Sequence, residues 1–314
     1  MQKTVKKSVT LNGNGLHSNQ DVTLTIKPAD ENHGIVFKRV DLPHLSEEDK
    51  LIPALWHNVS DTTLCSMIAN DKKVMVSTIE HLMAALRALG IDNALIEIDA
   101  DEVPILDGSS KEIIEEIEKI GLKSLNAPRK AIRVLREVTY QDGDRKVTLR
   151  PSHDDVPRYK VMIDYADPTI GKQEATLKLV NGDFKHDIAD CRTFCLYRDI
   201  QAMQSAGKAL GGTLKNAVVV DDHGVMNEGG LLCENEFARH KLLDAVGDLA
   251  LAGGLVLGCY ESERAGHEMN NKILRALFAD ERNYEIVDHY VEFENEPPIA
   301  YDTVRISHPV PTRS

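Results

Sequence analysis

Two short stretches, one in each half of the 314-residue chain, carry side chains that can bind a metal ion and move protons. The first contains Glu80 and His81, and the second contains His240, Asp244 and Asp248, each four residues from the next. Residues four apart share one face of an α-helix, so His240 and Asp244 can reach the same ion. Two histidines and one carboxylate leave a position for water on zinc, and a further carboxylate can take the proton of that water. These stretches predict a hydrolytic metal site.

The same residues also have purely structural interpretations. Ser77 and Glu80 have the spacing of a capping box, in which the glutamate bonds back to the start of its own helix. The next residue, His81, lies among alanines and could be a core histidine. The polar stripe of the second stretch could face solvent, opposite the apolar face of the same helix. On these segments alone, both interpretations stay open.

A third histidine, His267, follows Gly266 at the start of the last predicted helix. It could be an ordinary helix-start residue. As part of the site it would be a cationic acid or an electrostatic group, with Asp248 as the carboxylate that keeps it protonated.

Composition restricts the class of protein. Hydrophobic residues make up 42% and charged residues 28%, which is typical of a soluble globular protein. The net charge of -13 argues against nucleic acid as a partner. We expect neither a membrane span of about 20 apolar residues nor a signal peptide. Five cysteines, an odd number, favour reduced thiols and the cytoplasm, and Cys191 and Cys195 lack the second pair of a zinc site.

The elements that position these residues can be predicted from periodicity. Alternating residues around 22–27 are typical of a strand, and residues 1 to about 60 consist mainly of strands. A helix over 78–89 ends near Gly90, and a strand follows at 94–98. Residues 107–109 then begin a second helix with an apolar isoleucine face.

The second half of the chain repeats this order of elements. After a boundary at 124–128 we expect strands over about 130–180, a helix over 235–252, a strand at 255–260 and a helix over 268–279. The predicted fold class is α+β, with two domains of similar topology that each contain a sheet and a helix pair. The helices would be sandwiched between the two sheets, and the site would lie at the domain interface.

Each predicted domain carries a small insertion. The N-terminal domain, residues 1–126, contains a hairpin group at about 57–76. The C-terminal domain, residues 127–314, contains a strand–helix–strand unit at about 194–220.

Six segments, taken together, match one known family in order and over nearly the whole chain. They are residues 15–18, 77–86, 104–109, 192–194, 236–249 and 266–267. The chain thereby resembles the UDP-3-O-acyl-N-acetylglucosamine deacetylases, zinc enzymes of lipid A synthesis. One departure is Asn19, which stands where a loop of this family has glycine.

The resemblance implies the reaction and the metal ligands. His81, His240 and Asp244 would hold zinc, although a site of this composition also accepts iron. Glu80 would be the general base for metal-bound water. That water would attack the N-acetyl group of UDP-3-O-(3-hydroxyacyl)-N-acetylglucosamine, and acetate would be released in the committed step of lipid A synthesis.

The resemblance also assigns the remaining catalytic groups. The Thr193 hydroxyl would stabilise the oxyanion together with the metal. His267, paired with Asp248, would donate a proton to the leaving amine or act as a nearby cation. Whether Glu80 performs both proton transfers stays open.

The substrate would be a UDP-linked acylated glucosamine. Lys241 would meet its sugar or phosphates, Phe194 would pack against it, and Arg264 would lie near the diphosphate. The second insertion would form the passage for the acyl chain. Its expected walls are Leu196, Ile200, Met203, Ala209 and Leu210.

Two other functions remain as alternatives. A different zinc amidase would share the ligands but lack a long apolar channel. A non-enzymatic protein with a structural metal would need four protein ligands. Nothing in the sequence indicates an obligate protein partner, so we predict a monomer.

Overall fold

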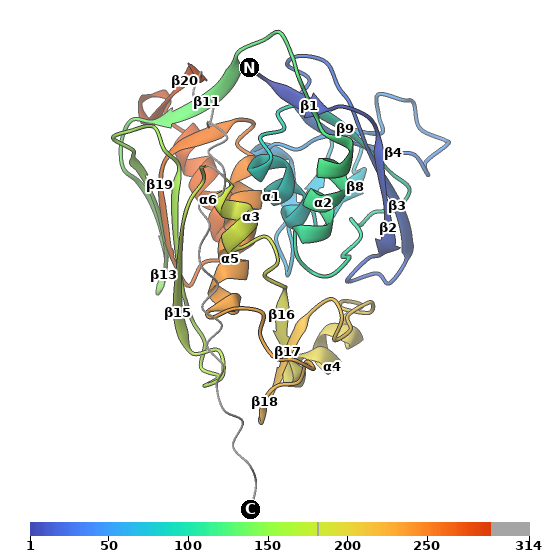
Figure 1. Ribbon diagram of the computed structural model, residues 1–314, viewed down its shortest axis with the longest axis vertical. Helices are drawn as coiled ribbons and strands as arrows, with labels where there is room; N and C mark the ends of the chain where they lie inside the picture. Colours follow the sequence, from blue (N-terminus) through green and yellow to red (C-terminus); the bar gives the residue numbers. More distant parts are fainter. Residues whose placement is uncertain (181, 290–314) are drawn as a thin grey trace, which may run out of the picture.

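The computed structural model describes residues 1–180 and 182–289, and it places a layer of helices between two β-sheets (Figure 1). This arrangement confirms the predicted α+β class. The predicted second domain extends to residue 314 and thus beyond the described residues. The division into residues 1–126 and 127–314 stays a prediction.

A five-stranded sheet covers one side of the helical layer, and its strands come from the first hundred residues (Figure 1). The strand β9 (Ala94–Ile98) has the predicted bounds and pairs in parallel with β4 (Ile35–Arg39) and antiparallel to β3 (Asp21–Lys27). Alternate residues of β3 are buried, as its alternating sequence predicts. The other strands of this half are β2 (Val9–Asn14), β5 (Leu51–Pro53), and the separate pair β1 (Lys3–Val5) and β10 (Leu122–Ser124).

A seven-stranded sheet covers the opposite side (Figure 1). Its central strand, β19 (Leu255–Glu263), pairs with three neighbours, and it is almost entirely buried at its N-terminal end. The other strands are β11 (Arg129–Val134), β12 (Val138–Asp142), β13 (Arg145–Pro151), β14 (Arg158–Asp164), β15 (Lys172–Lys178) and β20 (Tyr284–His289).

The helices begin and end within about two residues of the predicted positions. The central pair, α1 (Glu80–Ala88) and α5 (Glu236–Ala250), is buried on nearly every face, as expected for helices covered by sheets on both sides. The outer helices are α2 (Lys111–Ile120) and α6 (His267–Phe278), and the short helices are α3 (Asp183–Asp187), η1 (Trp56–Asn58) and η2 (Glu281–Asn283). No helix in the described ranges is long and apolar enough to cross a membrane.

Both predicted insertions form small units of their own. Residues 57–76 contain the three-stranded antiparallel sheet of β6 (Val59–Asp61), β7 (Met67–Ala69) and β8 (Met75–Val76). In the second unit, β16 (Phe194–Leu196) pairs in parallel with β17 (Val218–Asp221), and α4 (Tyr197–Ser205) connects them. The hairpin partner β18 (Gly224–Val225) extends this unit beyond residue 220. It lies at the lower end of the molecule in Figure 1, away from both large sheets.

Candidate active site

The first helix presents Glu80 and His81 from its N-terminal turn, but the capping-box interpretation of this turn is wrong. The Ser77 hydroxyl donates instead to the backbone carbonyl of Asp101, and Ser77 forms a bridge to Glu102. The carboxylate of Glu80 accepts a hydrogen bond from the backbone N–H of Ser66 at 3.0 Å. Glu80 is therefore directed into the interior by the first insertion.

The polar stripe of α5 is buried, so the interpretation that it is a solvent-facing helix surface is wrong. His240, Asp244 and Asp248 are only 1–3% exposed and lie on the side of α5 that meets α1. The two helices touch at Gly247, where an added Cβ would come within 2.0 Å of the carbonyl oxygen of Glu80. Only glycine permits this approach, which brings side chains from the two halves of the chain together.

His81, His240 and Asp244 converge as the sequence predicted. The Asp244 Oδ1 atom lies 3.5 Å from Nε2 of His81 and 3.4 Å from Nε2 of His240. One potential ligand atom from each residue lies within 4.8 Å of the others, so the group could hold a metal ion.

The donor set fits a divalent metal ion. Oδ1 of Asp244 is buried and finds no hydrogen-bond partner among residues 1–180 and 182–289. A buried carboxylate oxygen without a partner is unfavourable unless a cation compensates it. Burial lowers the pKa of His240 to about 3, so its imidazole is neutral and can offer a lone pair.

Backbone and side-chain contacts fix the orientation of His240. Its Nδ1 lies 3.0 Å from the carbonyl oxygen of Cys191, so an Nδ1–H donated there leaves Nε2 for the metal. The next residue, Arg192, forms an ion pair with the fully buried Glu236 in the first turn of α5. Cys191 and Glu236 were not predicted as positioning residues. Their contacts join segments more than forty residues apart, so no local pattern marks them.

A second cluster beside the metal residues is suited to proton transfer. His267 Nδ1 lies 2.8 Å from Oδ2 of Asp248, and its Nε2 lies 3.9 Å from Glu80 Oε1. Asp248 also accepts hydrogen bonds from the hydroxyl of Ser66 and the amide of Asn270. Ser66 and Asn270 were not predicted, and no local pattern in the sequence marks them.

The charges of this cluster are set by burial and by its neighbours. Burial raises the pKa of Glu80, because a carboxylate without water around it is less stable than the neutral carboxyl group. For His267, burial acts in the opposite direction, but the Asp248 and Glu80 carboxylates outweigh it and raise the pKa to about 9. His267 is therefore a cation at pH 7.

The predicted substrate residues Phe194 and Lys241 lie next to the metal-binding cluster, and the predicted catalytic residue Thr193 precedes Phe194 in the chain. Lys241 Nζ is 2.8 Å from Oδ2 of Asp244 and 5.7 Å from the centre of the Phe194 ring. The backbone N–H of Thr193 donates to the carbonyl of Gly108 at 2.8 Å, which ties the second insertion to the first half. Thr193 and Phe194 line a pocket that begins at this point.

This pocket has an empty volume of about 890 Å³ and is lined mainly by apolar side chains of the second insertion. Three predicted walls line it: Ile200, Met203 and Ala209. Leu196 instead lines a smaller pocket with Val220, and Leu210 is 45% exposed and absent from the lining. The helix pattern alone could not distinguish these orientations.

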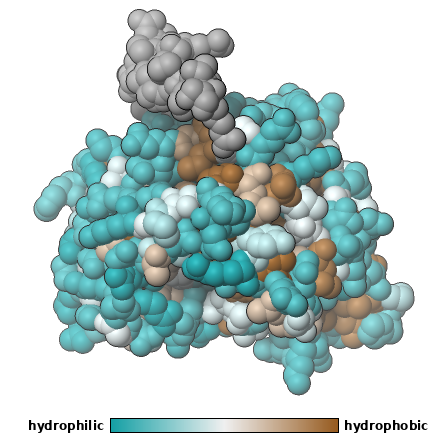
Figure 2. Space-filling model, turned by 90° about the horizontal axis from the view of Figure 1, so that it is seen from below, coloured by the Kyte–Doolittle hydropathy of each residue, from teal (hydrophilic) through white to brown (hydrophobic). Residues whose placement is uncertain are grey.

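Apolar surface surrounds the mouth of the pocket. Leu64, Leu214 and Met226 line it and remain 38–49% exposed. Figure 2, which views the molecule from the end that carries the insertion, shows hydrophobic residues between polar ones on this face. Exposed apolar side chains that surround a hollow are typical of a site for a hydrophobic ligand.

A loop from the first half closes one side of the pocket. The Glu102 carboxylate accepts hydrogen bonds from the backbone N–H groups of His17 and Ser18, both at 2.8 Å. Nδ1 of His17 accepts one from the N–H of Ala209. Asn19 has a φ of 55°, so it adopts the left-handed conformation that favours glycine. Asparagine is one of the few other residues that adopt this conformation readily, so it is compatible with the turn.

Arg264, which was predicted to lie near the diphosphate, is not among the residues that line the apolar pocket with Thr193 and Phe194. Its guanidinium forms ion pairs with Asp144 and Asp164. A role for Arg264 in substrate binding stays a prediction.

Comparison with known proteins agrees with this geometry. Residues 2–279 match the sequence profile of the LpxC family, described as UDP-3-O-acyl N-acetylglycosamine deacetylase. The chain belongs to this family. Its similar relatives include proteins named UDP-3-O-acyl-N-acetylglucosamine deacetylase from Shewanella violacea and Pseudomonas entomophila. Each is 42% identical, with 96% of this chain covered and 96% and 97% of the relatives. The family is one of deacetylases, which agrees with the resemblance of the six sequence segments.

Proposed function

We propose that this protein removes the N-acetyl group of UDP-3-O-(3-hydroxyacyl)-N-acetylglucosamine by metal-dependent hydrolysis, as the committed step of lipid A synthesis in the cytoplasm. The observation that carries the proposal is the convergence of His81, His240 and Asp244 beside Glu80 and next to an apolar pocket. Three protein ligands leave a coordination position open, which distinguishes a catalytic site from a structural one.

The metal we propose is zinc. A bound zinc ion supplies Lewis acidity, which lowers the pKa of water and polarises a carbonyl group. Two nitrogen ligands and one oxygen ligand suit zinc and also iron.

Glu80 is the proposed general base. Its carboxylate takes the proton of the attacking water, and burial, which raises its pKa, makes it a stronger base than an exposed glutamate. Ser66 holds one carboxylate oxygen, so the other oxygen, Oε1, is directed toward His267.

His267 is the proposed acid. Its pKa of about 9 keeps it protonated at neutral pH, and Asp248 fixes the ring through Nδ1 so that Nε2 can donate a proton to the leaving amine. The Thr193 hydroxyl, from a residue that lines the pocket next to Phe194, donates to the developing oxyanion.

The apolar pocket is the proposed site of the acyl chain, with Phe194 at its inner end. Lys241 contacts Asp244 and the Phe194 ring, and this supports a place for the sugar or phosphates between the metal residues and the pocket.

Acetate release from the acylated UDP-sugar tests this function. We expect activity that disappears after chelation and returns with added zinc. A folded, zinc-loaded protein that releases no acetate from this substrate but hydrolyses a smaller acetamide would instead indicate a different zinc amidase.

A further inference from the structure

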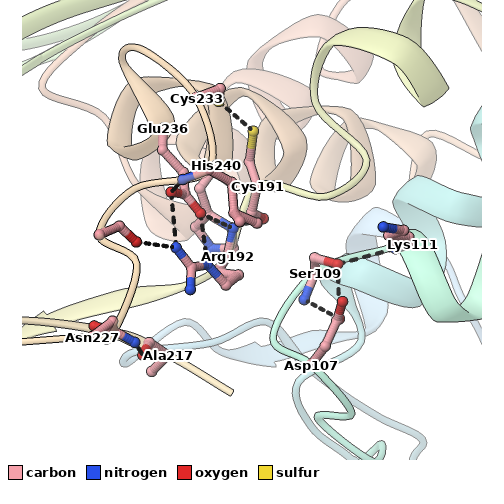
Figure 3. Close-up of polar contacts among 12 residues, drawn as sticks. Asp107, Ser109, Lys111, Cys191, Arg192, Ala217, Asn227, Cys233, Glu236 and His240 are labelled. Atoms are coloured by element: carbon pink, nitrogen blue, oxygen red, sulfur yellow. Dashed lines mark hydrogen bonds and ion pairs between the residues drawn. The ribbon is translucent and has the colours of Figure 1, made fainter. Parts of the chain in front are cut away.

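Two of the five cysteines have their thiols in contact. Sγ of Cys191 lies 3.7 Å from Sγ of Cys233, and Figure 3 shows the two side chains directed toward each other. Both are free thiols. Cys191 is completely buried, whereas Cys233 is partly exposed on the loop before α5.

We propose that Cys191 and Cys233 are a site of reversible oxidation by low-molecular-weight disulfides, and that the resulting internal disulfide weakens metal binding at His240. The first part depends only on the thiol pair. The second part rests on the metal site of the proposed function.

The reaction balances as two thiol–disulfide exchanges. The thiolate of Cys233, the accessible residue, attacks a small disulfide, forms a mixed disulfide and releases one small thiolate. Cys191 then loses its proton and attacks the Cys233 sulfur, which releases the second small thiol. Both protein thiols are oxidised, and the small disulfide is reduced to two thiols. A hydrogen bond from Cys191 lowers the pKa of Cys233, which agrees with this order of attack.

The contacts of Cys191 explain how a Cys191–Cys233 disulfide would affect the proposed metal site. A disulfide requires an S–S distance of about 2.05 Å, so the two segments must approach each other from a sulfur separation of 3.7 Å. The backbone carbonyl of Cys191 is the group that orients His240. A shift of this carbonyl removes the hydrogen bond that directs Nε2 of His240 toward the metal.

One buried carboxylate connects the two cysteine segments. Glu236 accepts hydrogen bonds from the backbone and guanidinium of Arg192, which follows Cys191. It also accepts one from the N–H of Leu232, which precedes Cys233. Figure 3 shows Arg192, Glu236 and His240 beside the sulfur contact. Because Glu236 holds both segments, a displacement of one segment is passed to the other through this carboxylate.

Thiol counting on the full chain tests the oxidation. The protein is treated with glutathione disulfide, alkylated after unfolding and weighed by mass spectrometry. We expect loss of two thiols, a Cys191–Cys233 cross-link in the peptide map and full recovery with dithiothreitol. Cys195→Ser is the matched control and should still form the cross-link. A glutathione adduct that remains on Cys233 while Cys191 is alkylated would overturn the proposal.

Competition for zinc with a chromophoric chelator tests whether the disulfide weakens metal binding. Oxidised protein should bind zinc about 10- to 100-fold more weakly than reduced protein, the range seen when a contact behind a metal ligand is lost. Cys233→Ala, treated in the same way, should keep the affinity of the reduced protein. Equal affinities of the two redox forms would refute the coupling. No zinc binding by the reduced protein would refute the proposed metal site, whereas the thiol count would be unaffected.

Discussion

Two buried histidines of the site have opposite charge states because burial outweighs the nearby carboxylate in one and not in the other. Burial lowers the pKa of His240 to about 3, although the Asp244 carboxylate, 3.4 Å from Nε2, acts in the opposite direction. His267 is equally enclosed but lies against Asp248 and Glu80, and these carboxylates raise its pKa to about 9 in spite of burial. The neutral ring is suited to bind a metal, and the cationic ring is suited to donate a proton.

The role of Glu80 can be separated from that of the metal residues. In Glu80→Gln the side chain keeps its shape and its contact with Ser66 but cannot accept a proton. We expect normal zinc content and a turnover that is slower by about 100-fold or more, the scale of a lost general base. Zinc analysis and acetate release on the same sample measure this. A turnover close to that of the wild type would show that Glu80 is only structural.

The proposed role of His267 as a general acid predicts how activity depends on pH. His267 is protonated below its pKa of about 9, so activity should fall as the pH rises through that value. In Asp248→Asn the charge that raises this pKa is removed, and the alkaline limb should move to lower pH. A pH–rate profile of both proteins measures the shift. Asp144→Asn, which affects only a surface ion pair with Arg264, is the control. Identical alkaline limbs would argue against His267 as the acid.

At the scale of elements, the crossing of α1 and α5 sets the geometry of the site. The helices meet backbone to backbone at Gly247, so Glu80 and His81 are placed against His240 and Asp244 without intervening side chains. The arrangement of the candidate metal-binding residues thus depends on one position that has no side chain.

Gly247→Ala should separate the helices. The added methyl would lie 2.0 Å from the Glu80 carbonyl oxygen, and backbone cannot move aside as a flexible side chain can. We expect a loss of at least about 1–3 kcal/mol in the free energy of unfolding, the usual range for overpacking. Denaturant unfolding measures it. Gly266→Ala, where an added Cβ meets nothing within 4 Å, should have a much smaller effect. Equal stability of the two variants would show that the crossing can adjust.

The second insertion can be tested by filling its pocket. Met203 lines the pocket, so the larger side chain in Met203→Trp should fill part of it. We expect kcat/KM for a long-chain substrate to fall by about 10-fold or more and kcat/KM for a short-chain substrate to stay unchanged. Leu210→Trp adds the same bulk at an exposed position outside the lining and should leave both substrates unaffected. If Met203→Trp acts equally on both chain lengths, the pocket does not hold the acyl chain.

Local patterns predicted the elements well and the contacts between them poorly. The strand at 94–98 and both ends of α5 follow from periodicity, because the residues that define them are neighbours in the sequence. The spacing of Ser77 and Glu80 misled, since Ser77 bonds to Asp101 and Glu80 to Ser66 instead of capping the helix. Long-range partners of this kind leave no signature in a short window.

At the scale of the whole molecule, three carboxylates are buried where the two halves of the chain meet. Glu80, Asp244 and Asp248 are each at most 3% exposed. Lys241 and His267 compensate part of this charge, but Oδ1 of Asp244 stays without a hydrogen-bond partner within the described part of the chain. A bound cation would relieve this unfavourable burial.

Removal of the metal should therefore destabilise the folded protein. At free zinc one hundred times its Kd, a single site contributes about 2.7 kcal/mol of stability, and chelation removes this contribution. Thermal unfolding with zinc, with chelator and after zinc is restored measures the change in Tm. Asp244→Ala should lose the zinc-dependent part of the Tm. A zinc effect of the same size in that variant would place the ion elsewhere.

The candidate metal ligands could be predicted from the sequence, but the contacts that support them could not. His81, His240 and Asp244 stand out by residue type and spacing. The contact from the Cys191 carbonyl cannot be predicted from the residue type, because every amino acid has a backbone carbonyl oxygen. Such a contact becomes visible only when the chain is folded.

The separation of the second insertion from the helix crossing has an evolutionary consequence. At Gly247 not even a methyl group fits, so a substitution there would displace the residues that converge at the helix crossing. The strands and helix of the insertion lie outside the two main sheets, and their pocket walls come mainly from one continuous segment (Figure 1). Substitutions there can change which ligands fit without disturbing the chemistry. A variant with a different ligand preference could therefore arise from changes in this one segment, because the helix crossing would not have to move.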